Sequence, residues 1–296
     1  AVVTSSLALG MREMIQRHAL IRKLSSVETL GAATVICSDK TGTLTQNEMT
    51  VTRLWADGQF INLTGTGYAP NGEFQVDGAK VDVNKYPAIL STLWLGLLNN
   101  DSLLETTGEY ESQQTYRIVG DPTEGALLVA AAKAGAMHLE INEAYPRENE
   151  VPFDPERKRM ITIHDVRDPK AHDPSPFYDE KHKDWDVIAV KGAPDIVLDL
   201  CTQYQGMDDK PMPMTREAKE RILAANDAMT KDALRVIGLA YRLEKDVPDD
   251  PEEIKADELE KDLVFVGLTG MIDPPRTEVK PALEHARHAG IRTVMI

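Results

Sequence analysis

The sequence predicts an α/β domain that is interrupted by an inserted α+β domain. Apolar strand patterns with neighbouring helical patterns lie towards the two ends of the chain, near 33–37 and 291–296, and a long stretch of mixed short strands and helices separates them. The chain also has 296 residues, and one hydrophobic core rarely grows beyond about 250–300 residues. We therefore expect two domains, joined by two crossing strands near 45–52 and 265–275.

Composition and charge narrow the class of protein. The apolar share of 42% and the charged share of 27% are those of a soluble globular protein. Acidic residues outnumber basic ones 48 to 33, and the net charge of −15 argues against nucleic acid as a partner. Cys37 and Cys201 are too few for a disulfide framework or a zinc site and fit a reducing, cytosolic setting. We expect no signal peptide, and apolar windows such as 88–98 fall short of the roughly 20 residues that span a bilayer.

The elements at the start of the chain lead into a polar turn. Helical apolar spacing predicts helices over 6–18 and 25–30, and a β-branched run predicts a short buried strand over 33–37. This strand ends near Asp39, and a turn of small hydroxyl residues with one glycine follows it. In an open parallel sheet, ligands and catalytic groups collect at the carboxyl ends of the strands.

The remaining elements are predicted by periodicity and by turn residues. Further helices are expected near 86–99, 122–136, 215–231 and 276–290, the last of them ending at Gly290. Further strands are expected near 159–164, 186–191, 233–243 and 263–272. Residues 165–185 are rich in Pro, His, Asp and Lys, which indicates an exposed loop.

Residues 39–45 read DKTGTLT and carry the strongest functional signal. An isolated Asp before such a turn is about as consistent with a backbone cap as with a nucleophile. The complete string, however, resembles the phosphorylation signature of the P-type ion-pumping ATPases residue for residue. The resemblance implies that Asp39 accepts the γ-phosphoryl group of ATP, with Mg²⁺ bound at Asp39 and Thr41. It also implies phosphate or hinge roles for Lys40, Thr41, Gly42, Thr43, Asp273 and Arg276.

Thr41 separates this reading from that of a stand-alone phosphatase. Phosphatases of the same fold carry a second aspartate at that position as a general acid–base. Without that base the acyl phosphate should hydrolyse slowly, so a phosphoenzyme would persist long enough to drive a conformational change.

The resemblance extends over the whole chain and implies a domain plan. Residues 1–24 resemble the end of the fourth membrane helix and its stalk. Residues 25–47 and 272–296 resemble part of a haloacid-dehalogenase-like, Rossmannoid phosphorylation domain, and 48–271 resemble the inserted nucleotide-binding domain with its antiparallel sheet. The family's later phosphorylation-domain motifs would follow residue 296, so we expect this stretch alone to phosphorylate poorly or not at all.

Short motifs in the inserted domain imply an ATP or ADP site. "GDPTEGALL", "FDPERKRM", "KGAPD" and "ALRVIGLAYR" resemble, in family order, the nucleotide-binding motifs. The residues that they imply for the adenine and phosphates are Glu124, Phe153, Arg157, Lys158, Lys191 and Arg235. Pro155 stands where some pumps carry a basic residue, so phosphate contact would come from Arg157 or Lys158. Taken singly, each motif also fits a structural role, such as a core aromatic or a solvated charged turn.

Three functional readings remain open at this point. The first is a cytosolic part of a type II, calcium-pump-like cation pump, in which the ion is calcium or alternatively sodium or another cation. The second is a stand-alone phosphatase, disfavoured by Thr41, and the third is a non-catalytic nucleotide-binding or interaction module. The first reading implies ATP and Mg²⁺ as cofactors and a position at the cytosolic face of a membrane.

Overall fold

The computed structural model describes residues 2–108, 114–136, 138–167, 185–245, 247–248, 250 and 254–296. Two compact units are present: Ala1–Asn47 with Pro275–Ile296 (unit 1), and Glu48–Pro274 (unit 2). Most of the loop expected at 165–185 lies outside the described residues. Within the part of the chain that is described, no helix is long and apolar enough to cross a bilayer.

Unit 1 consists of short helices and one parallel pair of strands. Its elements are α1 (Val2–Gln16), α2 (Leu24–Gly31), β1 (Val35–Ser38), α9 (Val279–His288) and β15 (Arg292–Met295). β1 and β15 pair in parallel, with Val35 opposite Arg292 and Ser38 opposite Met295. Helix α9 ends before Gly290, whose φ of +75° is the left-handed conformation expected of a helix-terminating glycine.

The expectation that the first strand is buried is wrong for this structure. Val35 and Ile36 are 48% and 42% exposed. Two paired strands cannot cover both of their own faces, and burial of β1 needs further strands or helices packed against it. The strand itself is present where its β-branched run predicts it.

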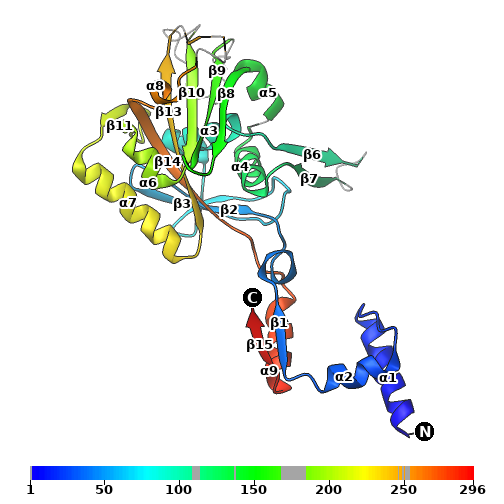
Figure 1. Ribbon diagram of the computed structural model, residues 1–296. Helices are drawn as coiled ribbons and strands as arrows, with labels where there is room; N and C mark the ends of the chain where they lie inside the picture. Colours follow the sequence, from blue (N-terminus) through cyan, green and yellow to red (C-terminus); the bar gives the residue numbers. More distant parts are fainter. Residues whose placement is uncertain are drawn as a thin grey trace. The chain divides into compact units, whose positions relative to one another are not determined.

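Unit 2 is built on a large antiparallel sheet (Figure 1). Its main strand order is β5-β4-β3-β2-β14-β13-β10-β9-β8, with β11 paired in parallel to β14 and β12 antiparallel to β11. The strands are β2 (Thr50–Ala56), β3 (Gln59–Leu63), β4 (Phe74–Val76), β5 (Ala79–Val81), β8 (Arg147–Asp154), β9 (Arg159–Asp165), β10 (Asp186–Gly192), β11 (Cys201–Gln205), β12 (Pro211–Pro213), β13 (Arg235–Glu244) and β14 (Leu263–Ile272). β6 (Leu103–Thr107) and β7 (Thr115–Val119) form a separate hairpin. The antiparallel sheet of the fold prediction is confirmed.

Helices cover both faces of this sheet. They are α3 (Pro87–Leu98), α4 (Pro122–Lys133), α5 (His138–Ala144), α6 (Pro194–Asp199), α7 (Arg216–Lys231) and α8 (Ala256–Leu259), with a short helical turn at Val83–Lys85. A further helical turn, at Lys40–Leu44, belongs to unit 1. β10 shows the two faces by its alternation: Val187 and Ala189 belong to one buried cluster, and Ile188 and Val190 to the other.

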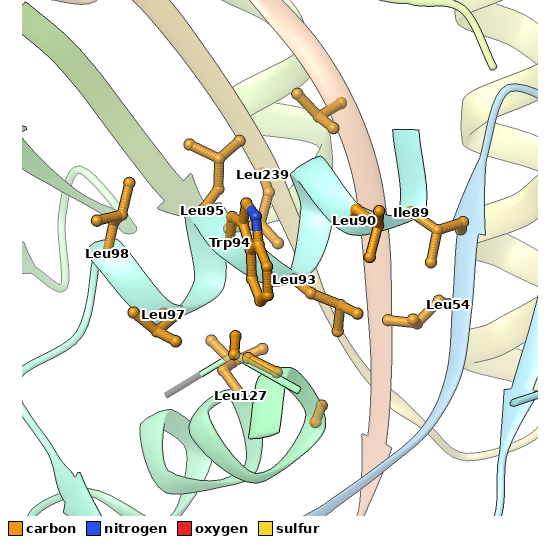
Figure 2. Close-up of a cluster of buried hydrophobic side chains, with 14 of the residues drawn as sticks. Leu54, Ile89, Leu90, Leu93, Trp94, Leu95, Leu97, Leu98, Leu127 and Leu239 are labelled. Atoms are coloured by element: carbon orange, nitrogen blue, oxygen red, sulfur yellow. The ribbon is translucent and has the colours of Figure 1, made fainter. Parts of the chain in front are cut away.

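Helix α3 is the centre of the larger cluster. Every residue from Ala88 to Leu98 is buried, as expected of a helix that is apolar all round. It packs on β2, β10, β13 and β14 and against α4. Figure 2 shows Trp94 among leucines of α3, with Leu127 of α4 and Leu239 of β13 nearby. Helix α7 contributes Ile222 and Met229 to the cluster on the other face.

The crossing strands lie where the chain passes between the two units. β2 and β14 pair antiparallel, with Thr50 opposite Ile272. The backbone N–H of Glu48 donates to Oδ1 of Asp273 over 3.3 Å. The outgoing and returning segments of unit 2 are therefore direct neighbours.

Candidate functional site

A cavity of about 650 Å³ opens at one end of the unit 2 sheet. This volume is within the usual range of small-molecule sites. It is formed where α4 begins, β8 and β10 end and β13 begins, and its walls combine apolar and charged side chains. The lining residues are Asp101, Asp121, Thr123, Glu124, Leu127, Phe153, Lys158, Lys191, Gly192, Ala193, Arg235, Val236 and Ile237.

A buried ion pair lies at the base of the cavity. Lys191 is 6% exposed, and its Nζ donates to Oε1 of Glu124 over 2.5 Å and to the carbonyl of Asn99. Burial lowers the pKa of Lys191, and the carboxylate of Glu124 opposes that shift. Because the ammonium already has two acceptors, it has at most one further hydrogen bond to offer a ligand.

The local sequence explains why Glu124 faces this lysine. Asp121 caps α4 by accepting from the N–H of Thr123 over 2.7 Å and from that of Glu124 over 3.4 Å. Pro122 occupies the first helical turn, where its missing N–H costs nothing. Glu124 then lies in the first turn, where the helix dipole favours a carboxylate, and its Oε2 accepts from the N–H of Asp101 over 3.0 Å.

Phe153 reaches the cavity from the end of β8, and Lys158 reaches it from the tight turn that follows. The side chain of Phe153 is 57% exposed, which is a large exposed fraction for an aromatic residue. Its ring is therefore accessible to a planar group that stacks on it. Lys158 has a φ of +55°, and its N–H donates to the carbonyl of Asp154. Oδ1 of Asp154 accepts from the N–H groups of Glu156 and Arg157, which lowers its pKa.

Arg235 lies across the same cavity at the start of β13. Its guanidinium donates to Oγ1 of Thr123 over 2.9 Å. The turn fixes the backbone of Lys158, and a hydroxyl accepts from the guanidinium of Arg235. Neither cation is paired with a carboxylate among the described residues. That arrangement leaves their charge available to an anionic ligand.

Arg157 departs from the expectation that it faces the same ligand. Its guanidinium pairs with Oε1 of Glu260, a carboxylate that is only 3% exposed, and it does not line the cavity. A buried carboxylate is strongly destabilising unless a cation pairs with it. The pairing with Glu260 therefore directs the guanidinium of Arg157 away from the cavity. The structure thus brings together five of the six predicted residues: Glu124, Phe153, Lys158, Lys191 and Arg235.

In unit 1, Asp39 lies at the start of the loop after β1 and is exposed to solvent. Its Oδ1 accepts from the N–H of Lys40 over 2.7 Å. Gly42 has a φ of +74°, a conformation that a side chain would strain. Oγ1 of Thr45 accepts from the N–H of Gly42 and donates to the carbonyl of Lys40, so it closes the loop from within. Thr41 and Thr43 are exposed beside it.

The returning segment fastens this loop. The N–H of Arg276 donates to the carbonyl of Leu44 over 3.0 Å, and its guanidinium lies 3.3 Å from the carbonyl of Gly42. Thr45 also forms a bridge with Pro275. Arg276 therefore stabilises the Asp39 loop through its hydrogen bonds to Leu44 and Gly42. Asp273, by contrast, belongs to unit 2, where its carboxylate accepts from the N–H of Glu48.

The oxygen atoms around Asp39 suit an Mg²⁺ ion that takes only some of its ligands from the protein and the others from substrate phosphates and water. Asp39 offers a carboxylate and Thr41 offers oxygen atoms, which is the donor type that Mg²⁺ prefers. Among the described residues, no group of three or more His, Cys, Asp or Glu side chains could hold a metal ion alone. Mg²⁺ sites of this kind are completed by substrate phosphates and water.

Three residues around the cavity were missed by sequence reasoning. Asn99 supplies the carbonyl for Lys191, while its amide donates to the carbonyls of Met160 and Ala189 over 3.1 and 2.7 Å. Arg147 donates to Oδ1 of Asp101 and to the carbonyl of Asn100. Glu260 pairs with both Arg157 and Arg159. None carries a local signal, because each acts on a partner distant in the chain.

The class of protein follows from comparison with known families. The family model described as P-type ATPase, cytoplasmic domain N, matches residues 89–278. This match covers more than half of the chain, and the chain belongs to this family. The resemblance drawn from the DKTGTLT and nucleotide motifs is confirmed.

Individual relatives extend the similarity to the whole chain. A calcium-transporting ATPase of Bacillus subtilis is 39% identical over 297 residues, which cover 100% of this chain and 30% of the relative. A cation-transporting ATPase of Synechocystis is 40% identical over 302 residues, with the same two coverages. A calcium-transporting ATPase of Listeria monocytogenes is 38% identical over 301 residues, covering 100% of this chain and 29% of the relative. The chain spans about 30% of the length of these curated relatives.

Proposed function

We propose that this chain is the ATP-binding and phosphoryl-accepting part of an ATP-driven cation pump at the cytosolic face of a membrane. The observation that carries the proposal is the cavity in which Glu124, Lys191, Phe153, Lys158 and Arg235 meet. It offers an aromatic face for a base, polar groups for its edge and two cations for phosphates, which is the chemistry that a nucleotide requires. The DKTGTLT loop adds a nucleophile.

The chemistry proposed for Asp39 is phosphoryl transfer. A carboxylate oxygen of Asp39 attacks the γ-phosphorus of ATP, a P–O bond forms, and the bond to the bridging oxygen breaks so that ADP leaves with the electron pair. Mg²⁺, when bound, would offset the negative charge of the two anions that meet there. The loop contributes the backbone of Gly42, which a ligand can approach closely, and the hydroxyls of Thr41 and Thr43.

The transported ion proposed here is calcium. Two of the relatives reported above carry calcium in their names, and the third is named only for cation transport. A sodium pump or another cation pump of the same type is the alternative within the class. A phosphatase is disfavoured because position 41 is threonine, which cannot serve as a general acid–base carboxylate.

Nucleotide binding to this chain tests the cavity assignment. Phe153→Ala removes the exposed ring and should weaken ADP binding by about 1–3 kcal/mol, the usual effect of losing an aromatic stacking partner. Met212→Ala is the matched control, because Met212 is also an exposed apolar residue, 44% exposed on β12, and does not line the cavity. Titration calorimetry on all three proteins decides the point; equal affinity in wild type and Phe153→Ala would remove the assignment.

Phosphoenzyme formation tests the role of Asp39. In a full-length protein that carries this sequence, Asp39→Asn should abolish acid-stable, hydroxylamine-sensitive label from γ-labelled ATP and leave ADP binding intact. Asp77→Asn is the control, since Asp77 is an exposed carboxylate in the β4–β5 turn with a φ of +50° that asparagine also adopts. Label that persists in Asp39→Asn would show that another residue accepts the phosphoryl group.

A further inference from the structure

The turn between β8 and β9 carries one residue of the cavity, Lys158, and directly follows the strand end that carries another, Phe153. Lys158 is the last residue of the turn, and Phe153, which is more than half exposed, is the penultimate residue of β8. The carboxylate of Asp154 shapes the turn from within through two backbone N–H groups. The carbonyl of Lys158 accepts from the N–H of Ala193 over 3.0 Å and so joins the turn to the end of β10.

A single buried carboxylate anchors this turn from outside. Glu260 follows α8 and is 3% exposed, and its two oxygens pair with the guanidinium groups of Arg157 and Arg159. Arg159 also donates to the carbonyl of Arg157 over 2.9 Å, so the two arginines are tied to each other and to the carboxylate. Bonds of this charge-assisted, two-oxygen kind restrict orientation as well as adding energy.

Glu260 is itself fixed by the element that carries it. Its N–H donates to the carbonyl of Ala256 over 3.0 Å at the end of α8, and the preceding residue, Leu259, is buried in the second hydrophobic cluster. Directly afterwards the chain enters β14, the strand next to β13 in the sheet. The anchor thus links the nucleotide turn to a strand of the core.

We propose that Glu260 is a positioning residue for nucleotide binding, which holds Arg157 and Arg159 so that the turn presents Phe153 and Lys158 to the cavity. The inference rests on the proposed function and assigns Arg157 to the anchor instead of the phosphates. Without the carboxylate, two guanidinium groups two residues apart would lose their shared partner and repel each other. The turn would then sample other conformations, and both cavity residues would lose their fixed place.

The test compares Glu260→Gln with Glu258→Gln in the 296-residue chain. Both substitutions remove one negative charge from the same short segment. Glu258 is a suitable control because it pairs only at the surface, with Lys255 over 3.3 Å, and both side chains are more than 60% exposed. ADP affinity is measured by titration calorimetry on protein whose folded fraction is known from circular dichroism. A second measurement follows trypsin cleavage after residues 157–159 by mass spectrometry under native conditions.

The positioning role predicts a specific combination of results. Glu260→Gln should bind ADP about tenfold more weakly per folded molecule, and trypsin should cut the turn faster, because Arg157 and Arg159 are no longer held. Glu258→Gln should match the wild type in both measurements. A purely structural role of Glu260 would lower the midpoint of urea unfolding but leave the ADP affinity of folded molecules unchanged, and that outcome would overturn the proposal.

Two further outcomes remain decisive. If Glu260→Gln does not fold, Glu260→Asp takes its place: its shorter side chain keeps the charge but cannot span both arginines, so an intermediate loss of ADP affinity supports the proposal and wild-type affinity refutes it. If the wild type itself binds no ADP, the proposed nucleotide function fails. Trypsin cleavage then still decides whether Glu260 orders the turn, and an unchanged cleavage rate rejects that role as well.

Discussion

The two units of the chain differ in how much side-chain surface they bury. Unit 2 contains two hydrophobic clusters, one on each face of its sheet. In unit 1, Thr45 is the one buried side chain among those that are described. Regions with few buried apolar contacts open locally at low free-energy cost, whereas core strands open only with global unfolding. The cavity of unit 2 therefore rests on a well-packed core, whereas the loop of Asp39 is held by hydrogen bonds from Thr45 and Arg276.

The largest expected effect comes from the core of unit 2. Trp94 is 1% exposed and lies among the largest fully buried side chains. Trp94→Ala should lower the free energy of unfolding by about 3–5 kcal/mol, because it leaves a cavity that the surrounding helix and sheet fill only in part. Urea unfolding followed by circular dichroism measures this change. A loss below about 1 kcal/mol would contradict the view that this cluster carries the stability of the unit.

A pH-dependent effect of intermediate size should also come from unit 2. His164 is fully buried; its Nδ1 lies 3.0 Å from the carbonyl of Tyr145, to which it donates, and its Nε2 accepts from Oγ1 of Thr162. Burial lowers the pKa of His164 from 6.5 to about 4. Between these values the unfolded chain binds more protons than the folded one, so stability should fall as the pH is lowered through this range, by up to about 1.4 kcal/mol per pH unit from this residue.

The matching measurement is urea unfolding at several pH values between 6.5 and 4. His164→Gln should show a shallower loss of stability with falling pH than the wild type, whatever its absolute stability. His285→Gln is the control, because His285 is exposed on α9 of unit 1. Equal slopes in the wild type and His164→Gln would show that the buried imidazole does not control this pH dependence.

The smallest effect is expected in unit 1. Ile36 on β1 is 42% exposed, so its truncation removes little buried surface. Ile36→Ala should change the free energy of unfolding by about 0.5 kcal/mol or less, as surface substitutions usually do. The same urea experiment that measures Trp94→Ala tests it. A loss as large as that of Trp94→Ala would erase the contrast between the two units.

The local pattern of residues was sufficient to predict several of the longer elements of unit 2, but not its short strands and helices. The apolar run near 86–99 and the amphipathic run at 215–231 correspond to α3 and α7. The short apolar, β-branched segments at 159–164 and 186–191 correspond to β9 and β10. These predictions succeed because period and propensity are properties of neighbouring residues. The motif order also predicted five residues that the fold brings to one cavity.

Long-range partners could not be predicted in the same way. Arg157 and Glu260 are 103 residues apart, and nothing local in either segment indicates that a buried carboxylate turns the arginine away from the cavity. The exposure of β1 was missed for a related reason: the β-branched run specifies a strand, but burial depends on which elements pack against it. Pairing and burial are decided by the tertiary structure.

The side-by-side ends of unit 2 have a consequence for how such a unit is carried by other chains. Thr50 and Ile272 are opposite each other in the sheet, and Glu48 contacts Asp273 directly. Unit 2, from Glu48 to Pro274, can therefore be inserted into a surface loop of another domain without separating the two ends of that loop. The reason is that the first and last residues of the inserted unit are adjacent in space. Geometry of this kind makes the segment portable: it could be grafted into a different scaffold, or its own ends joined into a ring by a short linker, with the sheet undisturbed.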